Sequence, residues 1–399
     1  MALGPKPQEI GGGGLMHVGV ISPEFPPEVG GIQTYAYEYV RELVRRGLRV
    51  TVFTRPHADG EASLPGVKVV PVLRLRRAPD RNVLRTPAID VWHVMNAAYA
   101  WVALETSPVV ISVHGNDFLQ PYLPVARPDL QRLPCLWRSS RWRPALEQAL
   151  GRWLTERLVR RALPRATHIL ANSRYTEQVL LKRHPACRGI TSAGLVGVSS
   201  EYLACKPTRT AIGHSRLLTV CRLAEPRKNV NLVLQALARL KDRHRFCYTV
   251  VGDGPLRPGL EQLTSELELR DRVRFVGFVD NSALRGLLAK SDLFVLTSSI
   301  SAASHEGFGI AYLEANACGT PVLAARLAGA VEAVQEGVSG FFVDQPTPES
   351  ISAALEAFFL QQMSFDPAAC RAFAARFTWE RVVDHAVGYY RRNVTNITP

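Results

Sequence analysis

Short apolar runs alternate with amphipathic helical patterns along this chain, and the alternation occurs twice. In the first half, residues 17–22 and 109–113 are rich in β-branched side chains, and residues 32–46 place apolar side chains at helical spacing before Gly47. The pattern starts again at residues 217–221. Strands that alternate with helices form parallel sheets with helices on both faces. The sequence therefore predicts an α/β protein with two Rossmann-like, doubly wound parallel-sheet domains.

The remaining apolar runs and turn residues complete this prediction. Further strands are expected at residues 49–54, 67–72, 168–171, 246–251, 273–276, 293–297, 321–324 and 340–343. A helix is expected at residues 229–240, opening at an Asn cap.

The length of 399 residues suits two domains. Residues 1–15 include four consecutive glycines at 11–14, lack the pattern of a signal peptide, and are expected to be a flexible leader. We expect the first domain to span residues 16–205 and the second to span residues 206–376. The last segment, 377–399, is expected to be helical and could cross back to the first domain.

Composition excludes several classes of protein. The chain is 47% hydrophobic and 21% charged, which is ordinary for a globular protein and unlike a disordered or collagen-like one. No apolar run approaches the roughly 18 residues of a membrane-spanning helix. The seven cysteines lack zinc or redox spacing, so reduced thiols and a cytoplasmic location are expected.

Positive charge is concentrated in one stretch of the chain. The net charge is +13, and residues 127–165 hold ten arginines against three acids, a balance of +7. Trp142 and two further tryptophans lie in the same stretch. Arginine mixed with tryptophan and leucine is typical of surfaces that lie on anionic lipid, but nucleic-acid binding, phosphate binding and an ordinary solvated face remain open. The residues expected to form an acceptor-binding or membrane surface are Arg138, Arg141, Trp142 and Arg143.

The segment 305–322 carries the most informative pattern. Glu306 ends a polar loop after a predicted strand, and Gly307 and Gly309 allow backbone N–H groups to approach a ligand closely. A helix is expected to begin near Ile310, so its positive N-terminus suits a diphosphate. Glu314 then falls in the first or second helical turn, where it can reach a ribose diol.

Three other segments place polar groups at the carboxyl ends of predicted strands. Arg222 and Lys228 can converge on one anion, such as a leaving diphosphate. Gly30 and Gly31 offer backbone donors before the first helix, and His114 follows the strand at 109–113. The chain has no Asp-x-Asp and no His/Glu metal spacing, so we expect no metal and no prosthetic group.

These four segments, in this order, resemble the retaining family 4 glycosyltransferases, which have the GT-B fold of two Rossmann-like domains facing a central cleft. The resemblance runs from Met16 to about Tyr390, and residues 306–322 are similar to the family's Glu-x7-Glu signature with its flanks. The start at residues 26–35 is similar to mannosyltransferases that build phosphatidylinositol mannosides.

The resemblance implies that the first domain binds the acceptor and the second a nucleotide-sugar. It implies catalytic roles for His114, Glu306, Arg222 and Lys228. It implies donor-binding roles for Gly30, Gly31, Gly252, Gly277, Phe278, Gly307, Phe308, Gly309, Ile310 and Glu314.

We therefore expect retaining, metal-independent transfer of a hexose from a UDP- or GDP-sugar to an acceptor hydroxyl. Glycolipid or cell-surface polysaccharide synthesis is the favoured context, at the cytoplasmic side of the cell membrane and with peripheral membrane binding left open. The alternatives are a soluble sugar or sugar phosphate as acceptor, a nucleotide-sugar 2-epimerase on the same fold, and a basic nucleic-acid-binding protein. Nucleic acid is not among the expected partners of the favoured function.

Overall fold

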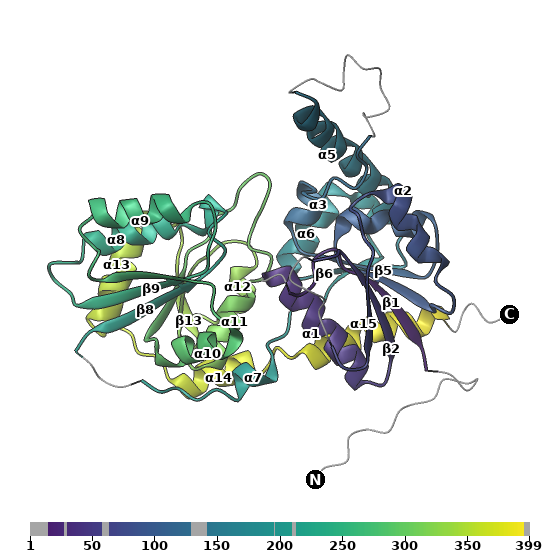
Figure 1. The fold of residues 1–399 in the computed structure, drawn as a ribbon. Helices are drawn as coiled ribbons and strands as arrows, with labels where there is room; N and C mark the ends of the chain where they lie inside the picture. Colours follow the sequence, from purple (N-terminus) through teal and green to yellow (C-terminus); the bar gives the residue numbers. More distant parts are fainter. Residues whose placement is uncertain are drawn as a thin grey trace, which may run out of the picture. The chain divides into compact units, whose positions relative to one another are not determined.

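The computed structural model describes residues 15–27, 30–57, 64–128, 142–194, 196–209 and 213–394. Packing divides the chain into two compact units. The first comprises residues 1–195 and 379–399, and the second comprises residues 196–378. Each unit contains one parallel sheet with helices on both faces (Figure 1). The predicted fold class, two doubly wound parallel sheets, is confirmed.

The first unit has a seven-stranded sheet in the order β3-β2-β1-β4-β5-β6-β7. Its strands are β1 His17–Ile21, β2 Arg49–Thr54, β3 Val67–Pro71, β4 Val91–Val94, β5 Val109–Val113, β6 His168–Ala171 and β7 Thr191–Ala193. Its α-helices are α1 Gly31–Arg45, α2 Arg77–Asp80, α3 Asn116–Leu119, α5 Arg143–Ala162, α6 Arg174–Arg183 and α15 Trp379–Val394. The described residues of this unit also form the 3₁₀ segments η1 Arg81–Arg85, η2 Ala97–Leu104, η4 Leu163–Arg165 and η5 Pro185–Cys187.

The second unit has a six-stranded sheet in the order β10-β9-β8-β11-β12-β13. Its strands are β8 Ser215–Val220, β9 Phe246–Val251, β10 Val273–Gly277, β11 Leu293–Leu296, β12 Val322–Ala325 and β13 Gly340–Val343. Its helices are α7 Ser200–Leu203, η6 Pro226–Lys228, α8 Val230–Ala238, α9 Arg257–Glu266, α10 Asn281–Lys290, α11 Ile310–Ala317, α12 Ala330–Ala333, α13 Pro348–Phe359 and α14 Pro367–Ala374. Figure 1 shows α8, α9 and α13 on one face of this sheet and α10, α11 and α14 on the other.

Burial explains why the central strands read as continuous apolar runs. Every residue of β1, β5 and β11 is buried, because helices cover both faces of each sheet. Packing is close enough to demand glycine at one central position, since a Cβ at Gly19 would lie 2.8 Å from the Trp92 ring.

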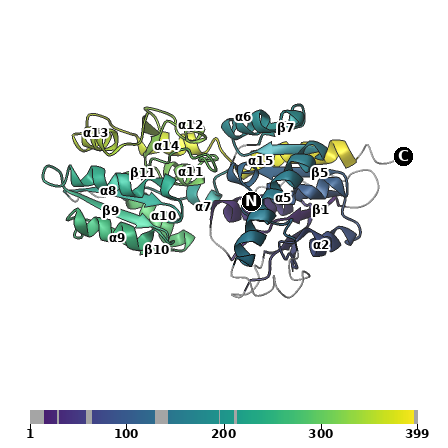
Figure 2. The same ribbon diagram turned by 90° about the horizontal axis from the view of Figure 1, so that it is seen from above.

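The C-terminal helix α15 belongs to the first unit. It lies beside β7 (Figure 2), where His385 Nε2 is 2.9 Å from Ser192 Oγ. On α1, the Tyr39 hydroxyl is 2.9 Å from that of Tyr390. The helix is amphipathic, and docking on α1 and the sheet buries its apolar side.

The second unit begins at Val196, earlier than the predicted boundary at residue 206. Val196 and Val198 are buried, and Val198 N donates to Phe377 O over 3.0 Å within the second unit. This pairing connects the start of the unit with its end. A search for periodicity along the chain overlooks it because the two partners are far apart in sequence.

Two strands and one cap differ from the sequence-based predictions. β4 and β7 were not predicted, because they are short and β4 contains Trp92 and His93. Asn229 precedes α8 but makes no side-chain cap, and its backbone is left-handed with a φ of 57°. Its side chain instead binds the loop after β11. Within the described residues, no helix has both the length and the apolar character needed to cross a bilayer.

Candidate functional site

The order in which successive strands are added to the second sheet reverses between β8 and β11. From β8 the chain proceeds outward to β9 and β10, and from β11 it proceeds the opposite way to β12 and β13. At such a switch point the loops after the two central strands diverge and leave room for a ligand at the carboxyl edge. These two loops, residues 221–229 and 297–309, carry all three residues of this unit with a predicted catalytic role, Arg222, Lys228 and Glu306, and the donor-binding residues Gly307, Phe308 and Gly309.

A buried carboxylate joins the two loops. Lys228 Nζ lies 2.6 Å from Glu306 Oε2, and Arg227 Nη1 lies 3.5 Å from the same oxygen. The Ser298 hydroxyl donates to that oxygen over 3.0 Å. The side chains of Lys228 and Glu306 are 13% and 12% exposed, so water screens this pair far less than a surface pair.

The surrounding cations keep Glu306 ionised. Burial alone raises the pKa of this carboxyl, but the charges of Lys228 and Arg227, with hydrogen bonds from Lys228 and Ser298, outweigh it and lower the pKa to about 2. Glu306 is therefore a carboxylate throughout the neutral range and can accept hydrogen bonds from hydroxyl groups.

Further contacts fix the two loops against each other. Asn229 Nδ2 donates to Thr297 O over 2.6 Å and to Ser299 Oγ over 2.7 Å. Ser299 N donates to Arg227 O over 2.7 Å, and Arg227 Nε lies 2.9 Å from Ser304 Oγ. The left-handed backbone at Asn229 therefore aims its amide across the switch point, which explains why it does not cap α8.

The loop from Glu306 to α11 requires glycine. Gly309 precedes α11 with a φ of 95°, and a Cβ there would lie 2.2 Å from the Tyr312 ring. Phe308 is buried against Phe377, with ring centroids 5.6 Å apart, so its side chain belongs to the core and only its backbone can face a ligand. α11 begins at Ile310, as predicted, and Glu314 lies half-buried in its second turn.

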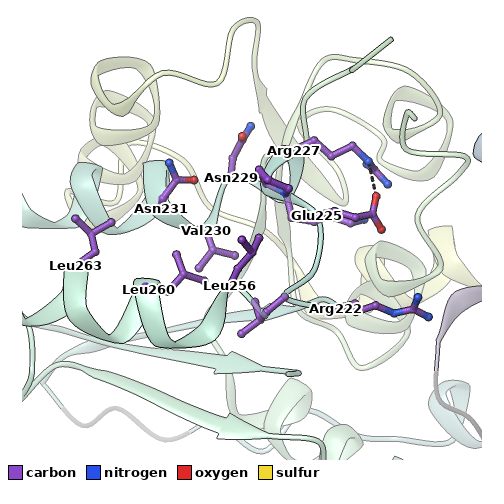
Figure 3. A pocket seen from close by; sticks show the side chains of 13 residues that line it. Arg222, Glu225, Arg227, Asn229, Val230, Asn231, Leu256, Leu260 and Leu263 are labelled. Atoms are coloured by element: carbon purple, nitrogen blue, oxygen red, sulfur yellow. Dashed lines mark hydrogen bonds and ion pairs between the residues drawn. The ribbon is translucent and has the colours of Figure 1, made fainter. Parts of the chain in front are cut away.

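Arg222 lies in a cavity beside the same loop. The cavity has a volume of about 590 Å³, and both predicted diphosphate ligands, Arg222 and Lys228, contribute to its wall. Figure 3 shows Arg222, Glu225 and Arg227 along one side, and leucines at the start of α9 and within it along the other. Neither Glu306 nor Glu314 is among the described residues that line this cavity. The structure thus brings Lys228 to both features, whereas Arg222 joins only the cavity.

The loops after β9 and β10 carry the predicted donor-binding residues Gly252, Gly277 and Phe278, and the two loops touch each other. Gly252 N donates to Gly277 O over 2.8 Å. Both glycines have positive φ, and a Cβ at Gly252 would lie 2.0 Å from Cys221 O. Phe278 follows with 59% of its surface exposed, which leaves its ring accessible for stacking.

In the first unit, His114 lies at the carboxyl end of β5. Its ring is buried and contacts Tyr35 edge-on, with ring centroids 4.7 Å apart. Burial lowers the pKa of His114 to about 4, although a hydrogen bond with the Met95 backbone acts in the opposite direction. The imidazole is therefore neutral at pH 7, and its Nε2 has no hydrogen-bond partner among the described residues.

Asp117 holds the His114 loop. Its Oδ1 accepts from His114 N and its Oδ2 from Ala97 N, each over 2.9 Å. Burial raises the pKa of Asp117 to about 6, although these backbone donors favour the ionised form. Gly30 precedes α1 with extended backbone, and a side chain at Gly31 would meet no atom within 4 Å in the described structure. Packing therefore does not require a glycine at position 31.

The structure also shows polar residues that the sequence patterns missed. Glu24 follows β1 and is buried; its Oε2 accepts from the Tyr122 hydroxyl and, over 3.1 Å, from Asn96 Nδ2. These residues meet at the switch point of the first sheet, between β1 and β4. Because β4 itself was not predicted, nothing along the chain indicated that Asn96 and Glu24 would be neighbours.

The structure describes only part of the predicted acceptor-binding or membrane surface. Arg138 and Arg141 lie outside the described residues, and for Arg143 only the backbone is described, as the start of α5. Trp142 is 81% exposed. In the described part of the chain, no cluster of three or more His, Cys, Asp or Glu side chains could hold a metal ion.

Comparison with known families matches both units. Residues 29–190 match the family described as Glycosyltransferase Family 4, and residues 211–374 match Glycosyl transferases group 1.

Two relatives illustrate the range of similar proteins. The chain is 27% identical over 370 residues to a GDP-mannose-dependent alpha-(1-6)-phosphatidylinositol monomannoside mannosyltransferase of Mycolicibacterium smegmatis, covering 84% of this chain and 87% of the relative. It is 26% identical over 395 residues to a D-inositol 3-phosphate glycosyltransferase of Mycolicibacterium gilvum, covering 92% and 86%.

Solved structures agree with the fold. Sucrose-phosphate synthase of Thermosynechococcus elongatus superposes with a TM-score of 0.73 at 19% identity, covering 94% of this chain and 98% of that one. Anabaena HepE, solved with UDP and glucose, superposes with a TM-score of 0.68 at 19% identity, covering 94% and 98%. These likenesses establish a GT-B glycosyltransferase fold.

Proposed function

The chain belongs to glycosyltransferase family 4, the retaining hexosyltransferases that use nucleotide-sugar donors, and from this premise we propose that it transfers a hexose from a UDP- or GDP-sugar to a hydroxyl of a lipid-linked or cell-surface glycan. Membership in a transferase family also removes the support for the two rival interpretations, a 2-epimerase and a nucleic-acid-binding protein.

The observation that carries the proposal is the Lys228–Glu306 contact at the switch point of the second sheet. Buried contacts hold a cation and a carboxylate there. The cation can bind the diphosphate of a nucleotide-sugar, and the carboxylate can bind the hydroxyl groups of its sugar. Lys228 has three N–H donors, so it can keep Glu306 and still donate to a diphosphate oxygen. Arg222, which is exposed, would supply a second cation to the leaving diphosphate.

The transfer breaks the bond between the anomeric carbon and the diphosphate oxygen and forms a bond from that carbon to the acceptor oxygen. The acceptor's proton passes to an oxygen of the leaving diphosphate. Negative charge grows on that diphosphate as the bond breaks, so preorganised cations and the N-terminus of α11 would stabilise the transition state. Glu306 would orient the sugar hydroxyls as a carboxylate, without forming a covalent intermediate.

We assign His114 the role of a neutral hydrogen-bonding group toward the transferred sugar. Its lowered pKa keeps the ring uncharged at pH 7, and its Nε2 is the ring nitrogen left without a partner among the described residues. We assign Glu314 to the donor ribose, and the exposed Phe278 with Gly252 and Gly277 to the nucleobase.

The names of the relatives support two acceptor classes. A lipid-linked acceptor is supported by the name of the mycobacterial relative that uses a phosphatidylinositol mannoside. A soluble sugar phosphate is supported by the relatives named for D-inositol 3-phosphate. The arginine-rich stretch of the first unit suits either, because both carry phosphate.

The test measures nucleoside diphosphate release from UDP- and GDP-hexoses, with and without each acceptor class, preceded by thermal shifts with UDP, GDP and ADP. We expect one nucleotide to stabilise the protein, turnover to persist in EDTA, and Glu306→Gln to abolish most of it. Glu268→Gln, at an exposed surface ion pair with Lys241, is the matched control and should stay active. Full activity of Glu306→Gln, or stabilisation by none of the nucleotides, would contradict the proposal.

A further inference from the structure

Helix α5 projects from the body of the first unit. Figure 1 shows its N-terminal half extending beyond the sheet and its neighbouring helices. Of residues 144–149, all but Glu147 are exposed, whereas Gly151, Thr155, Val159 and Ala162 are buried in the second half of the helix. The C-terminal half therefore anchors the helix, and the N-terminal half stands free of the core.

The anchor is a close contact with the preceding chain. A Cβ at Gly151 would lie 2.8 Å from Arg127 Cγ, and Ala126 N donates to Thr155 Oγ1 over 3.1 Å. Val159 and Ala162 complete the buried side and belong to the core cluster of this unit. This fixes which side of α5 faces inward.

The opposite side of the helix carries a continuous exposed stripe. Leu146 N donates to Trp142 O over 2.9 Å, so Trp142 already follows the helical register. Residues at spacings of four, seven, eleven, fifteen and eighteen from Trp142 lie on one face of a helix with 3.6 residues per turn. They are Leu146, Ala149, Trp153, Arg157 and Arg160, and all of them are exposed.

The stripe is divided along its length into an apolar half and a basic half. Trp142 and Leu146, 81% and 44% exposed, occupy the projecting end, and Trp153, 47% exposed, continues the apolar part of the stripe to the middle of the helix. Arg157 stacks on Trp153, with its guanidinium carbon 3.6 Å from the ring centroid, and Arg160 follows. Large apolar side chains that are exposed to this extent and lie next to arginines are characteristic of surfaces that insert into the interface of a membrane.

Charge favours an anionic partner. Helix α5 contains five arginines and two glutamates, a balance of +3, and one glutamate, Glu156, already contacts Arg183 at 2.6 Å and Arg160 at 3.5 Å. Tryptophan and arginine side chains both settle at the headgroup level, where the ring is partly buried and the cation meets lipid phosphates. A nucleic acid would use the arginines, but it would not require the apolar end of the stripe.

We propose that the stripe Trp142–Leu146–Trp153–Arg157–Arg160 is a docking surface for an anionic lipid bilayer, with the projecting apolar end inserted at the headgroup level and the arginines on lipid phosphates. The surface binds the membrane itself, and this binding does not depend on the transfer chemistry proposed above. A chain with Glu306→Gln should therefore still bind vesicles, so failure of one proposal is distinguishable from failure of the other.

The experiment is co-sedimentation of the full chain with phosphatidylglycerol/phosphatidylcholine vesicles and with pure phosphatidylcholine vesicles, at low and high salt. We expect binding to the anionic vesicles that weakens as salt rises. Trp142→Ser combined with Leu146→Ser should reduce the partition coefficient by about tenfold, and Arg157→Glu combined with Arg160→Glu should reduce it by at least about tenfold. The first pair is exposed at the projecting end, so the fold should be retained, as checked by thermal unfolding.

The control removes exposed apolar side chains elsewhere. Val331 and Leu360, in the second unit, are 45% and 55% exposed, and replacing both with serine should leave vesicle binding unchanged. Loss of the blue shift in tryptophan emission on vesicle binding in Trp142→Ser would support insertion of this ring.

Three results would overturn the proposal. The first is no retention on anionic vesicles at low salt. The second is retention that the stripe variants do not change. The third is self-association of the chain, or binding of an oligonucleotide, that uses this stripe and takes the place of vesicle binding.

Discussion

Removing the cation that contacts the buried carboxylate tests the electrostatics of the site most directly. Replacing Lys228 with methionine keeps much of the side-chain volume but leaves Glu306 with Arg227 at 3.5 Å and the Ser298 hydroxyl as partners. The pKa of Glu306 is lowered from 4.5 to about 2 in the folded chain. At about 1.4 kcal/mol per pKa unit, the surroundings favour its ionised form by roughly 3 kcal/mol. Because Arg227 remains, we expect Lys228→Met to reduce the free energy of unfolding of the second unit by about 2 kcal/mol at pH 7.

The assay is urea unfolding of four chains: the natural one, Lys228→Met, Glu306→Gln and the double variant. In the double variant no buried charge is left uncompensated, so Lys228→Met should cost much less when combined with Glu306→Gln. Lys241→Met, at the surface pair with Glu268, is the matched control and should change stability much less than Lys228→Met, because water screens this pair.

The pH dependence gives a second check. A carboxyl whose pKa is lowered on folding contributes stability that is complete above pH 4.5 and is lost as the pH falls toward 2. The stability difference between the natural chain and Lys228→Met should therefore narrow as the pH falls through this window. If Lys228→Met costs the same with and without Glu306→Gln, the reasoning about the pair is refuted.

Three further predictions concern the backbone, the ribose ligand and acid stability. Gly309→Ala forces a Cβ to 2.2 Å from an aromatic ring and should destabilise the second unit by at least about 2 kcal/mol, whereas Gly286→Ala, in the open interior of α10, should stabilise it by about 0.5–1 kcal/mol; similar melting temperatures of the two variants would contradict this. Glu314→Ala should mainly raise the donor KM, and a large fall in kcat at unchanged KM would argue against a ribose contact. Burial lowers the pKa of His114 to about 4, so the unfolded chain takes up its proton first as the pH falls. His114 should therefore lower the free energy of unfolding by up to about 1.4 kcal/mol for each pH unit as the pH falls from 6.5 to 4. In His114→Asn the free energy of unfolding should fall less steeply over this range.

The sequence and the structure agree best where a pattern is local. Strands such as residues 109–113 and 246–251 begin and end as expected, because β-branched runs bounded by turns need no distant partner to be identified. The start of α11 at Ile310 followed from two glycines before a helical pattern. β4 escaped prediction because a four-residue strand with Trp92 and His93 shows no alternation, although it pairs with both β1 and β5.

Individual site residues also show that local sequence patterns do not determine contacts between distant segments. Phe308 looked like a donor-loop residue, but its ring packs on Phe377, so its sequence position said nothing about where its side chain points. Asn229 looked like a helix cap, but it bridges to Thr297 and Ser299 across the switch point. In both cases a contact between distant segments outweighed the local preference.

The amino-acid order alone determined the class of fold, the family resemblance and the choice of polar residues at strand ends, because hydrophobic periodicity and short motifs are properties of neighbouring positions. The tertiary structure decided which of those residues meet. Lys228 and Glu306 are 78 positions apart, and they touch only because β8 and β11 become neighbours in the sheet. It also decided which side of α5 is exposed, since burial of the opposite side depends on packing against residues 124–127.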